Sequence, residues 1–214
     1  MSADKRVRVY RSPLRQAQAA RTRQALLDAA HRRFARAGYS AAALDDIAAD
    51  AGVSVQRLYA VFGSKPRLLL ALIRALKADV RVNERAHALI ADPAPARKLA
   101  AVAALTRVYC ERGLDVLEAA REAARTDRAV RRVWREVEGW RHRGNGAVVR
   151  SLAAVGALAP GLDEAHATDV LWSLTAHDLY RLYVRERGWP PARYEAWLAA
   201  SLARELCPHL PHLR

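Results

Sequence analysis

Hydrophobic positions in the first part of the chain recur at helical spacing in short, clearly separated runs. An apolar stripe predicts a first helix over about 16–37. It consists of Leu26, Leu27, Ala30, Phe34 and Ala37. Gly38 follows it, and glycine readily adopts the left-handed conformation that ends many helices. Shorter apolar runs predict helices over about 44–50 and 55–61. Since no apolar–polar alternation persists, the pattern indicates an all-α fold.

A fourth helix and several longer ones are predicted after this region. Ser64 can cap the fourth helix, and Pro66 suits its first turn, where the missing N–H is not needed. Beyond a loop at 92–97, the helical stretches are about 96–111, 113–124, 127–154, 164–187 and 191–206. The predicted organisation is a basic arm (1–15), a three-helix domain (16–66), a larger helical domain (67–206) and a tail (207–214).

A helix, a glycine turn and a short helix form the pattern of a helix-turn-helix DNA-binding unit. The second helix of such a unit presents its N-terminal residues to base edges in the major groove, so it can be short. Gln56 and Arg57 are predicted to read bases, since an amide pairs with adenine and a guanidinium with guanine. Val55 can meet a thymine methyl group. Leu58 and Phe62, four residues apart, are expected in the core.

The remaining predicted DNA contacts are to the phosphate backbone. Ser54 caps the short helix and its hydroxyl can also meet a phosphate, and the spacing of Tyr59 turns its hydroxyl toward the backbone. Lys65 lies at a helix N-terminus, which is itself an anion site. An ordinary helical hairpin is the alternative interpretation of this segment.

The charge of the chain favours an anionic partner. The formal net charge is +14, from 36 basic and 22 acidic residues. Between Lys5 and Arg36, ten basic residues accompany the single acid Asp28. This distribution indicates nucleic acid first and a membrane surface second, although an arginine-rich solvated surface would give the same total.

The segment 22–72 resembles the TetR family of transcriptional regulators, through the stretch LLDAAHRRFARAGYSAAALDDIAADAGVSVQRLYAVFGSKPRLLLAL. The family usually carries hydroxyl residues where this chain has Ala42 and Ala43, so a helix cap and a phosphate contact are expected to be lost. Val55 replaces a frequent lysine, and Ala60 stands where relatives often direct a histidine or aromatic ring at DNA. Ala43 and Ala60 therefore count among the predicted DNA-facing positions.

The resemblance implies a homodimer on a palindromic double-stranded DNA operator, acting as a repressor that a small molecule releases. A cytoplasmic location is expected because the two cysteines, Cys110 and Cys207, form no disulfide framework. A stripe on each of the stretches 164–187 and 191–206 can face a second subunit. The predicted interface residues are Trp172, Leu179, Tyr183, Tyr194, Trp197, Leu198, Ser201 and Leu202. The alternative is that these stripes fill the core of the single chain.

The resemblance also implies a pocket for a small-molecule effector. The sequence does not identify this ligand. Candidate lining residues are polar or aromatic groups on otherwise apolar helices: Thr106, Tyr109, Cys110, Trp134, Trp140, His142, Thr175, His177 and Tyr180. An acidic effector would need a buried arginine, for which Arg107 and Arg181 are candidates. No cofactor is predicted.

Three other functions are less consistent with the sequence. An enzyme is not predicted, because His177 and Asp178 point about 100° apart on a helix and no common catalytic motif is present. Cys207, His209 and His212 could ligate zinc or copper, but a fourth ligand is not evident, and no metal site is predicted. A basic helical protein that binds DNA non-specifically, or a membrane surface, is the remaining alternative. The apolar run at 68–73 is far too short to span a bilayer.

Overall fold

Four helices form the N-terminal part of the computed structural model, which describes residues 13–209. They are α1 (Pro13–Ala41), α2 (Leu44–Asp50), α3 (Val55–Phe62) and α4 (Lys65–Asp79). Gly38 interrupts α1 with φ 75° and ψ 169°, so the regular helix ends at the predicted place. The predicted second and third helices and the start of the fourth are confirmed.

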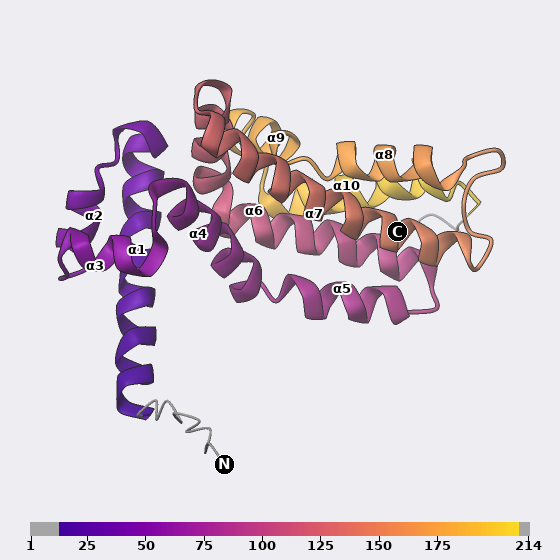
Figure 1. Cartoon of the computed structure of the whole chain (residues 1–214). Helices are drawn as coiled ribbons and strands as arrows, with labels where there is room; N and C mark the ends of the chain where they lie inside the picture. Colours follow the sequence, from indigo (N-terminus) through magenta and orange to yellow (C-terminus); the bar gives the residue numbers. More distant parts are fainter. Residues whose placement is uncertain (1–12, 210–214) are drawn as a thin grey trace, which may run out of the picture.

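The remaining helices form an elongated bundle (Figure 1). They are α5 (Val82–Ala91), α6 (Pro95–Thr126), α7 (Arg128–Ala153), α8 (Glu164–Leu174), α9 (His177–Tyr180), the π-helical segment η1 (Arg181–Glu186) and α10 (Pro191–Leu206). The long helices α6 and α7 pack against each other, and α8 and α10 complete the layer beside them. The described residues are helices joined by turns and loops, which confirms the all-α prediction.

The predicted break between 96–111 and 113–124 is wrong. Both stretches belong to α6, and Gly113 lies inside it. This glycine is needed for close packing: a Cβ at Gly113 would lie 1.9 Å from Cδ2 of Leu76 on α4. The loop predicted at 92–97 is also shorter, since α6 begins at Pro95.

The single helix predicted over 164–187 is also wrong. The chain leaves the helical conformation at Ala176, where ψ is 134°, and then resumes in α9 and η1. Before this break, the Thr175 hydroxyl donates to the Leu171 carbonyl at 2.7 Å. No glycine or proline marks the place, so the sequence carried no ordinary stop signal.

Two apolar clusters hold the fold together. One contains the buried residues of α1–α4, including Phe34, Ile47 and Leu58, and continues into α6 and α7 through Leu117 and Val130. The other lies in the bundle, where α6, α7, α8 and α10 meet. The boundary predicted at 66–67 falls at the start of α4 and stays a prediction, although the first cluster shows that α4 packs against helices on both sides of it.

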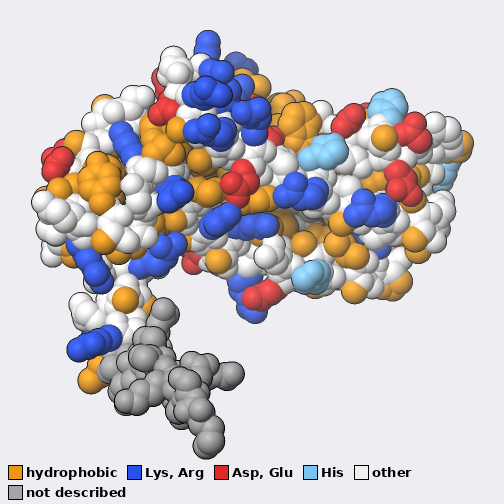
Figure 2. All heavy atoms as spheres, viewed as in Figure 1, with side chains coloured by type: hydrophobic (Ala, Val, Ile, Leu, Met, Phe, Trp, Pro, Cys, Tyr) orange, Lys and Arg blue, Asp and Glu red, His pale blue; other side chains and the backbone are white. Residues whose placement is uncertain are grey.

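Lys and Arg side chains cover more of the face shown in Figure 2 than Asp and Glu do, and they gather along its upper edge and across its middle. The N-terminal end of α1 projects away from the other helices (Figure 1), and every residue from 14 to 21 is exposed. Among the helices of the described residues, none combines the length and the apolar character needed to cross a bilayer.

Candidate functional site

The turn between α2 and α3 is built as its sequence predicts. Gly52 has a φ of 68°, which favours glycine. The Ser54 hydroxyl accepts a hydrogen bond from the Arg57 amide at 3.2 Å and so caps α3. Leu58 and Phe62 are buried on the inner face of α3. The short helix is therefore fixed at its start by a cap and along its length by the core.

The opposite face of α3 is open to solvent. Gln56, Arg57 and Ala60 are exposed, as is Tyr59, with 49% of its surface accessible. Val55 is half-buried and packs against the first apolar cluster. The face that carries the predicted base-reading residues is thus available to a partner.

The start of α2 lacks a side-chain cap. Ala43 occupies the capping position, is exposed, and offers no side-chain hydrogen bond to the helix. Arg33 of α1 holds α2 in another way, through ion pairs to Asp46 at 3.3 Å and Asp50 at 2.6 Å. The hydrogen bond from Arg33 lowers the pKa of the Asp50 carboxyl below its usual value.

The contacts of Lys65 in the structure differ from those expected of a phosphate ligand. Its ammonium group donates to the Ser40 carbonyl at 3.2 Å and lies 4.5 Å from the centre of the Tyr39 ring. Burial lowers the pKa of Lys65, and burial raises the pKa of the Tyr39 hydroxyl far above its usual value. The lysine therefore joins the start of α4 to the end of α1 in this structure.

Additional positive charge comes from α1. Arg15, Arg21 and Arg23 are exposed along its projecting half, and Arg23 lies 4.7 Å from the centre of the Phe62 ring at the end of α3. The projecting half of α1 therefore adds to the charge near α3. The predicted basic arm lies largely outside the described residues, which begin at Pro13.

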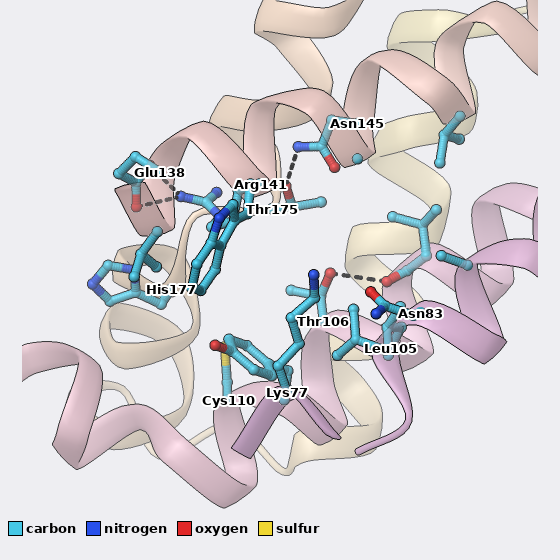
Figure 3. A pocket seen from close by; sticks show the side chains of 18 of the residues that line it. Lys77, Asn83, Leu105, Thr106, Cys110, Glu138, Arg141, Asn145, Thr175 and His177 are labelled. Carbon is cyan, nitrogen blue, oxygen red and sulfur yellow. Dashed lines mark hydrogen bonds and ion pairs between the residues drawn. The ribbon is translucent and has the colours of Figure 1, made fainter. Parts of the chain in front are cut away.

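A second candidate site is a cavity of about 200 Å³ inside the bundle. Helices α4 to α7 contribute to its wall, together with Thr175 directly after α8 and His177 at the start of α9. Figure 3 shows Arg141, Thr175 and His177 on one side of it, and Lys77, Thr106 and Cys110 on the other. Among the predicted effector residues, those that line it are Thr106, Tyr109, Cys110, Trp134, Trp140, Thr175 and His177.

Two residues predicted to line the pocket lie elsewhere. His142 points to the surface, where its Nε2 is 3.3 Å from an oxygen of Asp169. Tyr180 is buried in the second apolar cluster, with its ring edge-on to Tyr194 at 5.0 Å. The prediction that these two residues line the pocket is wrong for this cavity. The sequence indicated the helices that carry them, but not which face of each helix turns inward.

Five polar residues of the cavity wall were missed: Lys77 on α4, Asn83 on α5, and three residues of α7, which are Glu138, Arg141 and Asn145. The three α7 residues follow Trp134 at intervals of three and four residues, which places all four on one helix face. This spacing was the signal that could have found them. Asn145 donates to the Thr175 hydroxyl at 3.2 Å.

The arginine that reaches the cavity is Arg141. It is paired with Glu138 at 2.8 Å, and it also donates to the Trp172 carbonyl at 2.9 Å. The Trp172 indole donates to the same Glu138 carboxylate at 3.0 Å, so the charges are compensated locally. The arginines proposed from the sequence have other partners: Arg107 pairs with Glu195 and Glu111, and Arg181 with Glu118 and Glu186.

His177 is the most unusual polar group of the cavity wall. Its side chain packs edge-on against Trp134 with the ring centres 5.4 Å apart, and only 5% of the residue is exposed. Its Nε2 atom is buried and has no hydrogen-bond partner among the described residues. Burial, together with the positive charges of Arg141, Arg121 and Arg181, lowers the pKa of His177 to about 4. The imidazole is therefore neutral at pH 7.

Half of the residues predicted for a dimer interface are buried in the single chain. Tyr194, Leu198 and Leu202 are 0% exposed, so their assignment to the interface is wrong. These three form the inner stripe of α10, which packs against α6 and α8. Ser201 is 2% exposed but lines the open groove on α8 and α10, so its assignment stays a prediction.

The other four predicted interface residues are Trp172, Leu179, Tyr183 and Trp197, and all are half-buried. The Tyr183 ring lies 4.5 Å from those of both Trp189 and Trp197. An open groove borders this region on α8 and α10, and its lining includes Val170, Leu174 and Trp197. The outer faces of α8 and α10 are therefore the surfaces that a second subunit can reach.

The described residues do not form a metal centre. Between residues 13 and 209, no three His, Cys, Asp or Glu side chains are grouped to hold an ion. Cys207 is buried at the end of α10, and His212 lies outside the described residues.

Comparison with known proteins relates the N-terminal helices to one family. Residues 26–72 match the sequence model of the bacterial regulatory proteins of the tetR family. The HTH-type transcriptional regulator BetI of Agrobacterium fabrum is 42% identical over 80 residues, which cover 37% of this chain and 38% of that protein. The aligned region is thus little more than a third of either chain.

Solved structures extend the likeness of fold to most of the chain. FadR from Bacillus subtilis, in complex with stearoyl-CoA, has a TM-score of 0.70 at 16% identity, over 84% of this chain and 96% of that one. A putative transcriptional regulator from Saccharomonospora viridis, in complex with choline, has a TM-score of 0.68 at 18% identity, over 88% of this chain and 98% of that one. Both combine the helix-turn-helix end with a helical bundle. Residues 26–72 therefore carry the sequence pattern of the tetR family of bacterial regulatory proteins, and the chain as a whole shares the fold of these two solved regulators.

Proposed function

We propose that this protein is a ligand-released repressor that binds a palindromic operator as a homodimer. The observation that carries the proposal is the arrangement of α3. Leu58 and Phe62 anchor its inner face in the core, Ser54 caps its start, and Gln56 and Arg57 project from its outer face. A short, rigid helix with exposed base-reading residues suits insertion into the major groove.

Electrostatic attraction supports this binding mode. The exposed arginines of α1 lie on the helix that packs against α2, and one of them, Arg23, lies over the Phe62 ring at the end of α3. In this proposal they contact phosphates together with Ser54 and Tyr59, while Lys65 orients the end of α1. Phosphate contacts release counterions, so affinity is expected to fall steeply with salt for any DNA.

A palindromic operator requires two copies of α3 at a fixed separation. The outer faces of α8 and α10 are proposed as the dimer contact, in place of the inner stripe predicted from sequence. The groove there is lined by the apolar residues Val170, Leu174 and Trp197 together with polar and charged residues, a mixture that suits a protein interface.

The cavity is proposed as the effector site. Ligand complexes of two proteins with the same fold, one with stearoyl-CoA and one with choline, support a ligand site in the bundle. Helix α4 gives a route to the DNA-binding end, since Lys77 lines the cavity while Leu69 and Ile73 pack in the first apolar cluster. Ligand would then favour a separation of the two α3 helices that no longer matches the operator.

Selection of bound fragments from a random DNA library tests the function directly. A regulator should enrich one palindrome whose half-sites are about one helical turn apart. Footprinting on that sequence, with excess unrelated DNA present, should show protection of both half-sites. A basic protein that binds without sequence preference, as its charge also allows, would enrich no motif, and this result would contradict the proposal.

A further inference from the structure

One charged side chain of the cavity wall has no counter-ion among residues 13–209. The charged residues that line the cavity are Lys77, Glu138 and Arg141. Arg141 is paired with Glu138 at 2.8 Å, so these two charges compensate each other. The Lys77 ammonium makes no hydrogen bond or ion pair with the described residues, and its nearest aromatic contact is the Trp140 ring, whose centre lies 5.6 Å away. The wall therefore carries one uncompensated positive charge.

The Lys77 ammonium can be reached by a molecule in the cavity. The residue is half-buried, and its side chain extends from α4 toward the opposite wall (Figure 3). In contrast to Nε2 of His177, Nζ of Lys77 is not one of the buried, unpartnered side-chain atoms of the described residues. Because Nζ also lacks a hydrogen-bond partner there, it keeps surface that solvent or a bound molecule can contact.

The surroundings of Lys77 favour a negatively charged partner. Burial lowers the pKa of Lys77, and the positive charge of Arg143 lowers it further. Arg74, one turn earlier on α4, already has Glu136 at 2.7 Å, whereas Lys77 has no such carboxylate. An anion beside Lys77 would stabilise its charged form, and a cation in the cavity would add to the uncompensated charge.

The amount of charge points to one carboxylate. A single ammonium balances a single negative charge, whereas a phosphate monoester carries nearly two at neutral pH. A second, unpaired negative charge in a largely apolar cavity would be costly to bury. Ammonium–carboxylate hydrogen bonds are charge-assisted, and they are stronger than hydrogen bonds between neutral groups.

The size of the cavity suits a small ring. Its volume is about 200 Å³, and Tyr109, Trp134 and Trp140 contribute large aromatic surfaces to its wall. A dry apolar cavity of about 150 Å³ is large enough to bind benzene. One ring with a short substituent is therefore the size of molecule that fits.

We propose that the effector is a single-ring carboxylate, whose carboxylate group pairs with the Lys77 ammonium while its ring packs against the aromatic part of the cavity wall. This inference deepens the proposed function, because it rests on the cavity being the effector site. Leu69 and Ile73 of the same helix pack in the first apolar cluster, so the ion pair would act on the helix that reaches the DNA-binding end.

Isothermal titration calorimetry on the full-length protein tests the ligand class without DNA. The probes are 4-ethylbenzoate, its neutral isostere 4-ethylbenzamide, and the cation 4-ethylbenzylammonium. We expect 4-ethylbenzoate to bind at least about tenfold more tightly than either other probe, since a hydrogen bond between charged groups is worth about a factor of ten or more. Equal affinities for the benzoate and the amide, preference for the cation, or no binding of the benzoate would overturn the proposal.

Substitutions of Lys77 assign the preference to its ammonium group. Lys77→Met keeps most of the aliphatic side chain but removes the charge, so the benzoate should lose its advantage over the amide. Lys77→Arg keeps the charge and should retain at least part of that advantage. Circular dichroism checks the helix content of both variants. A benzoate preference that persists in a folded Lys77→Met protein would contradict the assignment.

A control substitution removes the same charge outside the cavity. Arg85 is exposed on α5 and does not line the cavity, so Arg85→Met lowers the net charge of the protein equally without changing the wall. It should retain the full preference for the benzoate. An equal loss in Arg85→Met and Lys77→Met would show that the overall positive charge, and not Lys77, selects the anion.

The effect of 4-ethylbenzoate on the affinity for operator DNA is measured separately. Binding of the benzoate without release of DNA would contradict the regulatory role of the cavity and leave the ligand class standing. Release of the operator only by uncharged or cationic compounds, with no binding of the benzoate, would overturn the ligand class and leave the proposed repressor standing.

Discussion

At the scale of single residues, Lys65 ties two helices of the DNA-binding end together. Lys65→Met keeps much of the aliphatic side chain but removes the hydrogen bond to Ser40 and the contact with the Tyr39 ring. We expect the free energy of unfolding in urea to fall by about 1–2 kcal/mol. Unchanged stability combined with weaker binding to all DNA would instead support a direct phosphate contact.

Arg57 is expected to contribute to specificity and not to stability. It is exposed on α3, and its side chain makes no ion pair among the described residues. Arg57→Ala should weaken binding to the selected operator by about 1–3 kcal/mol while leaving binding to random DNA much less affected. Fluorescence anisotropy with both DNAs at one salt concentration measures this difference. Equal losses on the two DNAs would show that Arg57 contacts only the backbone.

His177 is expected to make stability depend on pH. Its pKa is about 4 in the folded chain against 6.5 for a free histidine, so the unfolded chain takes up the proton first. The contribution is constant above pH 6.5, falls as the pH decreases toward 4, and levels off below that. The total loss is on the order of 3 kcal/mol. In urea unfolding at several pH values, His177→Phe should lack this decrease, and a parallel pH profile would contradict the assignment.

At the scale of elements, the contact of α4 with α6 joins the DNA-binding end to the bundle. Gly113→Ala would place a methyl group 1.9 Å from Leu76 Cδ2, so the side chain or the helix must shift. We expect destabilisation of about 1–3 kcal/mol, as for other overpacked cores. Gly144→Ala on α7 is the control, since no atom lies within 4 Å of the added carbon, and it should stabilise by up to about 1 kcal/mol. Similar thermal shifts in both variants would contradict the close contact.

The elements also show where sequence reasoning succeeds. The boundaries between α2, α3 and α4 could be predicted because Gly52 and Gly63 and the capping residues Ser54 and Ser64 mark them, and these signals act locally. The continuity of α6 could not, because Gly113 resembles a stop signal until Leu76 is seen beside it. Likewise, the cavity positions of Trp134 and Thr106 were predicted, but His142 was misplaced because the inward face of α7 depends on its packing against other helices.

At the scale of the whole molecule, the DNA-binding surface and the cavity lie at different places and share α4. Thermodynamic linkage requires that an effector which weakens DNA binding is itself bound more weakly by the DNA complex, by the same factor. Calorimetry with an active effector, with and without operator DNA, is expected to show this reciprocity. Equal effector affinity in both states would show that the cavity does not regulate DNA binding.

Dimerisation through α8 and α10 should be separable from the fold of the subunit. Val170 is half-buried in the groove on these helices, so Val170→Arg would place a charge in the proposed interface without filling the core. We expect sedimentation to show a monomer at micromolar concentration, and operator affinity to fall because a single α3 reaches one half-site. Leu14→Arg is the control for sedimentation, since Leu14 is 82% exposed on the projecting end of α1, remote from the groove. A folded Val170→Arg protein that sediments as a dimer would place the interface on another surface.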